Sequence, residues 1–172
     1  WLAFAAAVLL PEYRSEQMHG ILIGSFLCML VGAADDFVVR IPGVYKLATL
    51  FVVTLVLSYY GVRTSLTGYA AVDTLITMVW IAGVTSAFNC ADNMDGLAGG
   101  IAAIVSLLFF LIAMQAYLTV GTETSLSWFG MLAIGLAGSC AGFLVYNFRP
   151  ALVFMGDSGS FFLGFMLAAL SV

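Results

Sequence analysis

Charged residues are scarce in this sequence. Only 8% of its 172 residues are Asp, Glu, Lys or Arg, whereas 63% are hydrophobic, a composition outside the range of soluble globular proteins. The nine acidic and five basic residues give a net charge of -4, and they form neither a basic patch for nucleic acid nor a polybasic segment for a lipid surface. The composition predicts an integral membrane protein that binds no nucleic acid.

Cysteine and histidine, the usual ligands of zinc, are also rare. The three cysteines, Cys28, Cys90 and Cys140, lie within or beside apolar runs, and no two of them have metal-ligand spacing. We interpret them as small packing residues. The single histidine is His19, and we interpret it as a lone interfacial residue. The acidic and amide side chains therefore remain as candidates for chemistry.

Apolar runs fill most of the sequence. Breaks in the pattern separate about seven runs, at 1–10, 20–34, 47–62, 74–91, 97–119, 127–148 and 158–172. The charge-free stretches 96–122 and 124–148 exceed the ~20 residues that cross a bilayer as a helix. The alternating pattern of a β-barrel is absent, so helices must satisfy the backbone. The sequence predicts an all-α fold, a polytopic transmembrane helical bundle of about seven spans in one domain, 1–172, whose first and last spans are truncated.

Five aspartates form three clusters, and each cluster lies at the end of an apolar run. The clusters are Asp35 and Asp36, Asp92 and Asp95, and Asp157. A carboxylate at mid-bilayer costs on the order of 3 kcal/mol, so acids beside membrane spans indicate function. Two predicted crossings separate each cluster from the next, which places all three on the same side. The loops of that side carry Arg40, Lys46 and Arg149, against Arg14 and Arg63 on the other. This bias favours a cytoplasmic location.

The middle cluster combines carboxylates with amides. In a helix, Asn89, Asp92 and Asp95 would share one face, because they are three residues apart. Their oxygens make a hard-ligand surface that suits Mg²⁺ or Mn²⁺ better than zinc. The alternative interpretation is a polar helix cap. Two acids and two amides, Asn93 included, within seven residues exceed what a cap requires.

The first cluster is a pair of adjacent acids. Asp35 and Asp36 would point about 100° apart on a regular helix, so they would not chelate one ion together. We expect one of them to act and the other to support it. The alternative is an ordinary acidic helix terminus at the membrane interface.

The third cluster is a loop that enters a new helix. Pro150 ends the preceding span, Gly156 allows close backbone approach, and Asp157 begins the helix. Free N–H groups at such a helix start attract phosphate. Phe154 offers an aromatic face to a nucleobase, and Arg149 offers either a fixed charge for the same anion or a positive-inside anchor.

These three segments resemble known motifs. Asp35-Asp36, the stretch 89–96 and the stretch 147–160 are similar to the three central motifs of the polyprenyl-phosphate N-acetylhexosamine-1-phosphate transferases, in order and in separation. The resemblance implies Mg²⁺-dependent transfer of a sugar 1-phosphate from a UDP-sugar to undecaprenyl phosphate, with release of UMP, at the start of cell-envelope polysaccharide synthesis. A lysine-bearing segment before these motifs and a histidine-rich loop after them, both expected in the family, lie outside this sequence. We therefore expect this piece alone to be inactive.

The resemblance also implies residue roles on the donor side. Asp157 would be the principal Mg²⁺ ligand, with Mn²⁺ as an alternative ion. Asn89 and Asp92 would contact the metal or the uridine end, Asp95 would serve the nucleotide pocket, and Phe154 would stack on uracil.

On the acceptor side, Asp35 or Asp36 would position or deprotonate the lipid phosphate, and both direct and covalent mechanisms stay open. The sequence departs from the family pattern at Ser86, where many relatives have asparagine, and at Asn93, where glycine is common. These departures concern fine contacts to the substrate.

Further sequence motifs bear on the branch of this family and on other classes of membrane protein with paired aspartates. Asp-Asn-Met-Asp-Gly-Leu and Tyr-Asn-Phe-Arg-Pro-Ala resemble the GlcNAc-1-phosphate branch, with phospho-MurNAc-pentapeptide transfer as the alternative. An intramembrane aspartyl protease would carry Gly-x-Gly-Asp, whose first glycine is Phe154 here. An ion-coupled transporter would place its acids near mid-membrane. The expected partners are the UDP-sugar and the lipid phosphate in the plasma membrane, with the active site facing the cytoplasm, and a homodimer is compatible with this picture.

Overall fold

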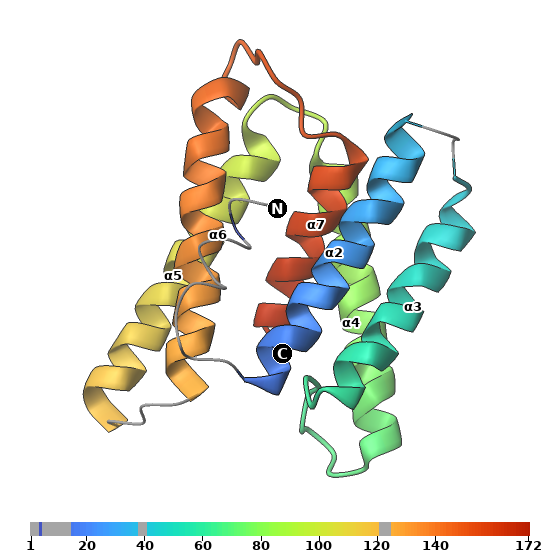
Figure 1. Cartoon of the computed structure of the whole chain (residues 1–172), viewed down its shortest axis with the longest axis vertical. Helices are drawn as coiled ribbons and strands as arrows, with labels where there is room; N and C mark the ends of the chain where they lie inside the picture. The colour runs from blue at the N-terminus through green and yellow to red at the C-terminus, as the bar shows by residue number, and fades with distance from the viewer. Residues whose placement is uncertain (1–3, 5–14, 38–40, 121–124) are drawn as a thin grey trace.

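The structure, a computed structural model, describes residues 4, 15–37, 41–120 and 125–172. Within these ranges every regular element is a helix, which confirms the predicted all-α class (Figure 1). The helices are α2 (Glu16–Phe37), α3 (Gly43–Tyr59), α4 (Ala70–Ala91), α5 (Leu97–Val120), α6 (Ser125–Asn147) and α7 (Gly156–Leu170).

The helices match the predicted apolar runs, but their lengths differ. The first run, 1–10, lies outside the described residues except for Phe4. In the described part, α2, α4, α5 and α6 are long and apolar enough to cross a membrane. The 17 residues of α3 and the 15 of α7 rise only about 25 and 22 Å, short of the ~30 Å hydrocarbon core. The expectation of about seven spans is therefore too high for the part described, because apolarity alone does not report where a helix begins and ends.

Helix α7 forms the centre of the bundle. Every residue from Ser160 to Leu170 is buried, and α7 packs most extensively against α2 and α4, while α5 and α6 form an antiparallel pair beside them (Figure 1). Because α7 is covered by protein, its short length does not have to match the bilayer.

Glycines let the backbones around α7 come close. An ideal Cβ on Gly24 of α2 would lie 2.5 Å from the Phe165 ring, and one on Gly164 would lie 2.9 Å from the Thr85 Cα of α4. The closest approach to another backbone is at Gly32, where a Cβ would lie 2.4 Å from the backbone oxygen of Asp157. Helix α2 therefore contacts the first turn of α7 directly.

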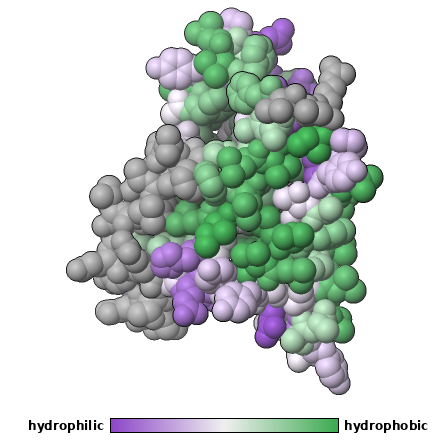
Figure 2. Space-filling view, turned by 45° about the vertical axis from the view of Figure 1, so that its right-hand side comes forward, coloured by the Kyte–Doolittle hydropathy of each residue, from purple (hydrophilic) through white to green (hydrophobic). Residues whose placement is uncertain are grey.

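The outer surface is apolar. Figure 2 shows hydrophobic side chains over the middle of one face, with the most hydrophilic residues nearer the lower and upper ends of the view. Large exposed apolar residues include Leu75 and Val79 on α4 and Ile104, Leu108 and Leu111 on α5. Such an extensive apolar surface is stable in lipid and would aggregate in water.

The acidic clusters meet at one end of the bundle, at the top of Figure 1. The ends of α2, α4 and α6 and the starts of α3, α5 and α7 lie there, because successive helices run in opposite directions. The crossing count therefore predicted the right arrangement.

Candidate functional site

The start of α7 is held by a carboxylate from α2. Asp36 accepts hydrogen bonds from the backbone N–H groups of Asp157 and Ser158, both at 2.9 Å. This arrangement is a helix cap supplied from another helix, and the negative charge complements the positive end of the α7 dipole. The expectation that these N–H groups bind a phosphate is not met, because a side chain of this chain already occupies them.

Gly156 makes this cap possible. Its φ of +64° lies in the left-handed region, and a Cβ at this position would lie 2.8 Å from Asp36 Oδ2. The predicted close approach at Gly156 is therefore confirmed, although the group that approaches is Asp36.

The second member of the acidic pair points elsewhere. Asp35 accepts hydrogen bonds from Lys46 Nζ at 2.7 Å and from the backbone N–H of Ile41. The same ammonium also forms an ion pair with Asp157. Asp35, Lys46 and Asp157 thus join α2, α3 and α7, and the two adjacent acids have different partners.

Sequence reasoning missed Lys46 as a site residue and counted it only as a loop charge. Two signals could have identified it. It is the only lysine among the 172 residues, and it lies in the first turn of α3 on the side that carries the acids.

Asn89, near the end of α4, holds Asp157 from the opposite direction. Its amide nitrogen donates to Asp157 Oδ1 at 3.1 Å and to Ser160 Oγ at 2.7 Å. Because the nitrogen faces the carboxylate, the amide oxygen points away from Asp157. In this geometry Asn89 orients Asp157. Asn89 is in turn held by Ser160, a residue that sequence reasoning did not single out.

A polar pocket of about 290 Å³ lies between the end of α4 and the start of α7. It brings together seven of the residues predicted from sequence, and its lining consists of Asn89, Asp92, Asn93, Met94, Asp95, Asn147, Phe154, Met155, Gly156 and Asp157. Half-buried Asp92 follows the last residue of α4. Burial, and then the nearby Asp157 carboxylate, raise the pKa of Asp92, so the two acids lie close enough to interact.

The expectation of one helical face for Asn89, Asp92 and Asp95 holds only in part. Helix α4 ends at Ala91, so Asp95 lies in the turn before α5 and still lines the pocket. Asp95 accepts a hydrogen bond from the backbone N–H of Ala151 at 3.2 Å. Its carboxylate therefore ties the α4–α5 turn to the α6–α7 loop.

A buried asparagine that sequence reasoning did not assign also connects the α4–α5 turn to the α6–α7 loop. Asn147, 5% exposed at the end of α6, accepts from the Gly96 N–H at 3.0 Å and donates to the Val153 carbonyl at 2.9 Å. Both loops are thus fixed around the pocket. Phe154, 75% exposed, stands on the pocket wall with its ring free to contact a ligand.

Three predicted residues lie at the margin of the pocket or beyond it. Asn93 lines the pocket but is exposed, and its amide nitrogen donates to the Cys90 carbonyl at 3.4 Å. Arg149 is exposed and does not line the pocket. Asp35 reaches the site through Lys46 and Asp157.

The donor chemistry of the pocket fits a hard divalent cation. Among the described residues no group of three or more His, Cys, Asp or Glu side chains forms a complete metal centre. Two carboxylates, Asp92 and Asp157, nevertheless share the pocket and repel each other. Mg²⁺ typically binds to one or two carboxylates and takes its other ligands from water and substrate phosphates.

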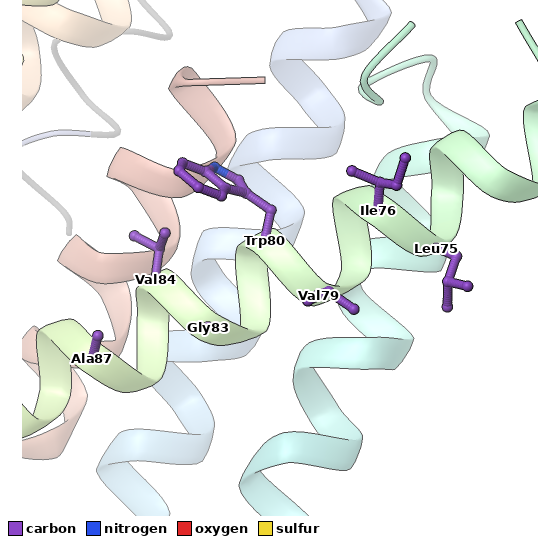
Figure 3. Close-up of a pocket in the computed structure, with 7 residues that line it drawn as sticks. All are labelled: Leu75, Ile76, Val79, Trp80, Gly83, Val84 and Ala87. Carbon is purple, nitrogen blue, oxygen red and sulfur yellow. The ribbon is translucent and has the colours of Figure 1, made fainter. Parts of the chain in front are cut away.

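A larger hollow, of about 560 Å³, lies on the outer face of α4 (Figure 3). Its lining is apolar and contains no acid: Leu75, Ile76, Val79, Trp80, Gly83, Val84 and Ala87. Such a surface suits hydrocarbon, and the polar chemistry belongs to the smaller pocket.

Comparison with known proteins gives a consistent picture. A sequence model of glycosyl transferase family 4 matches residues 18–172. A probable undecaprenyl-phosphate N-acetylglucosaminyl 1-phosphate transferase of Bacillus subtilis is 33% identical over 171 residues, which cover 93% of this chain and 45% of that protein. A decaprenyl-phosphate N-acetylglucosaminephosphotransferase of Mycobacterium tuberculosis is 32% identical, over 91% of this chain and 41% of that protein.

A second kind of relative is also similar. A phospho-N-acetylmuramoyl-pentapeptide-transferase of Heliobacterium modesticaldum is 31% identical over 191 residues, which cover 99% of this chain and 57% of that protein. The chain thus spans about half the length of the curated relatives it matches.

Proposed function

Because this chain belongs to glycosyl transferase family 4 and is an integral membrane protein, we propose that the protein transfers a sugar 1-phosphate from a UDP-sugar to undecaprenyl phosphate and releases UMP. The proposed sugar is GlcNAc. The observation that carries the proposal is the polar pocket that holds Asp92 and Asp157 at one end of an apolar bundle, where a water-soluble donor can meet a lipid acceptor.

The same site would hold Mg²⁺, or Mn²⁺ in its place. Asp157 and Asp92 are the proposed ligands, because their carboxylates share the pocket and its described lining contains no lysine or arginine. When bound, the ion would neutralise the donor diphosphate and stabilise charge at the transferred phosphorus. Asn89, which sequence reasoning assigned as a ligand, is proposed here to orient Asp157 through its amide nitrogen.

The proposed nucleotide subsite is the outer part of the pocket. Phe154 would stack on uracil, since its exposed ring forms part of the pocket wall. Asn93 would contact the nucleotide through polar atoms. Asp95 lines the same wall but shapes it through the α6–α7 loop, and Gly156 leaves the space that a side chain would fill.

The proposed acceptor subsite is near Asp35. Its carboxylate contacts Lys46, which also contacts Asp157, so a lipid phosphate placed beside this group would be close to the donor site. Asp35 would orient that phosphate or accept its proton. Asp36 is proposed as a positioning residue, because its oxygens already hold α7, and Arg149 is proposed as an interfacial anchor on the same side.

The proposed setting is the plasma membrane, with the pocket facing the cytoplasm. The described cations Lys46 and Arg149 lie at the pocket end of the bundle, and Arg63 lies at the other, a bias in the direction of the positive-inside rule. Residues 1–172 would form part of a single integral-membrane catalytic domain, whose activity requires the whole protein and which could pair as a homodimer.

A second candidate is transfer of phospho-MurNAc-pentapeptide, because a relative with that name matches 99% of this chain. The test is to incubate the full-length protein with undecaprenyl phosphate and each UDP-sugar and to measure UMP release. We expect turnover with UDP-GlcNAc that requires Mg²⁺ and is lost in Asp157→Ala. Turnover with the MurNAc-pentapeptide donor alone would select the second candidate, and turnover with neither would overturn both.

A further inference from the structure

The ammonium of Lys46 lies between two carboxylates from different helices. Its Nζ is 2.7 Å from Asp35 Oδ2 and forms an ion pair with Asp157 Oδ2. The side chains of Lys46 and Asp35 are only 15% and 16% exposed, and that of Asp157 is 30% exposed. The Phe161 ring covers the ammonium at 5.4 Å from its centroid. This shielding makes the pair stronger than an ordinary surface ion pair.

Both oxygens of Asp157 therefore have donors. Asn89 takes Oδ1 and Lys46 takes Oδ2, so a cation that binds Asp157 has to displace one of them or share its oxygen. Asn89 sits on α4 and is fixed by a second bond to Ser160. Lys46 has a flexible four-carbon side chain and retains Asp35 as a second partner. Lys46 is the group that can move.

We propose that Lys46 is a built-in competitor of the divalent cation at Asp157, an internal counter-charge that leaves Asp157 when the metal binds. The proposal rests on the metal site of the proposed function and adds its regulation. Lys46 lowers the metal affinity of the site when no substrate is present. Metal binding in turn releases the first turn of α3 from α7, so occupancy of the metal site is coupled to the position of α3.

Removal of the charge is the direct test. In full-length protein in detergent, without substrate, Mn²⁺ binding is measured by electron paramagnetic resonance of the free ion. We expect Lys46→Met to bind Mn²⁺ about ten-fold more tightly, because a hydrogen bond to a charged group is lost from the competing state. Lys46→Arg keeps the charge and serves as the matched control, with no gain in affinity. If Lys46 instead organises the site, Lys46→Met binds Mn²⁺ equally or more weakly, and the proposal fails.

A second measurement leaves Lys46 unchanged. An amine-reactive reagent, followed by mass spectrometry of the peptide that contains Lys46, reports whether its ammonium is shielded. We expect Mn²⁺ to increase the labelling of Lys46 several-fold in wild-type protein, and unchanged labelling at saturating Mn²⁺ would overturn the exchange. The variant Asp157→Asn distinguishes a failure of the metal site from a failure of the Lys46 exchange. If wild type binds Mn²⁺ no better than this variant, the metal site itself is wrong, whereas Asp157-dependent binding without the Lys46 effects refutes the exchange alone.

Discussion

A methyl group at Gly32 should separate α2 from α7 and disable the site without changing any polar residue. In Gly32→Ala the new Cβ would lie 2.4 Å from the Asp157 carbonyl oxygen and 2.5 Å from the Ser158 Cα. These neighbours are backbone atoms and cannot rotate away. An ordinary contact is at least 3.4 Å, so the two helices must move apart by about 1 Å at this point.

The movement affects the hydrogen bonds that hold Asp157. The Asp36 carboxylate, one turn further along α2, lies 2.9 Å from the two N–H groups of α7, and an extra 1 Å lengthens these distances beyond a hydrogen bond. Overpacking costs about 1–3 kcal/mol and a lost cap costs about 0.5–2 kcal/mol. Together these predict a loss of about 1.5–5 kcal/mol in stability. A 1 Å displacement of a reacting group typically costs about 100-fold in rate.

The assay uses the full-length protein in detergent or nanodiscs. Thermal unfolding gives the change in stability, and UMP release gives kcat. The matched control is Gly83→Ala, a helix-interior glycine of α4 at which a Cβ meets no described atom within 4 Å. Because alanine favours helix over glycine by about 1 kcal/mol, this control should keep its activity and gain slightly in stability. Gly32→Ala with wild-type unfolding and kcat within two-fold of wild type would refute the proposed contact between α2 and α7.

Three further predictions address other parts of the site. Asn147→Ala should lower stability by about 1–3 kcal/mol in thermal unfolding, because two backbone groups lose their buried partner, and wild-type stability would contradict this. Phe154→Ala should raise the KM for the UDP-sugar about ten-fold with little change in stability, whereas the equally exposed neighbour Leu152→Ala should change neither, and equal effects would exclude a stacking role. Asp36→Asn should lower the unfolding temperature by weakening the cap. Asp35→Asn should lower kcat with a smaller loss of stability. A larger loss of stability in Asp35→Asn than in Asp36→Asn would refute these separate roles.

Part of this arrangement could be read from the sequence. The convergence of three acidic clusters required only the number of crossings between them, and that number survives errors in where each helix begins or ends. This is why the prediction is confirmed although α3 and α7 are shorter than expected. Asn89, Asp92 and Asp157 could be grouped for the same reason.

The contacts of those residues could not be predicted. The cap of Asp36 on α7 joins residues 121 and 122 positions apart, and it depends on the close approach at Gly32, which no local pattern reveals. The same applies to Lys46 and Asp157, which are 111 positions apart. A helix start with free N–H groups was a sound local interpretation of Gly156 and Asp157, but tertiary packing supplied an internal carboxylate instead.

The adjacency of Asp35 and Asp36 acquires a physical explanation from these contacts. Two consecutive residues on a helix differ by about 100° in direction, so a pair at the end of α2 can serve two neighbours at once. Asp36 faces the start of α7 and fixes the backbone of Asp157, while Asp35 faces α3 and holds the ammonium that contacts the Asp157 side chain. One helix end thus sets both the position and the electrostatic environment of the same carboxylate. Two acids separated by three or four residues would lie on one face and could not do both.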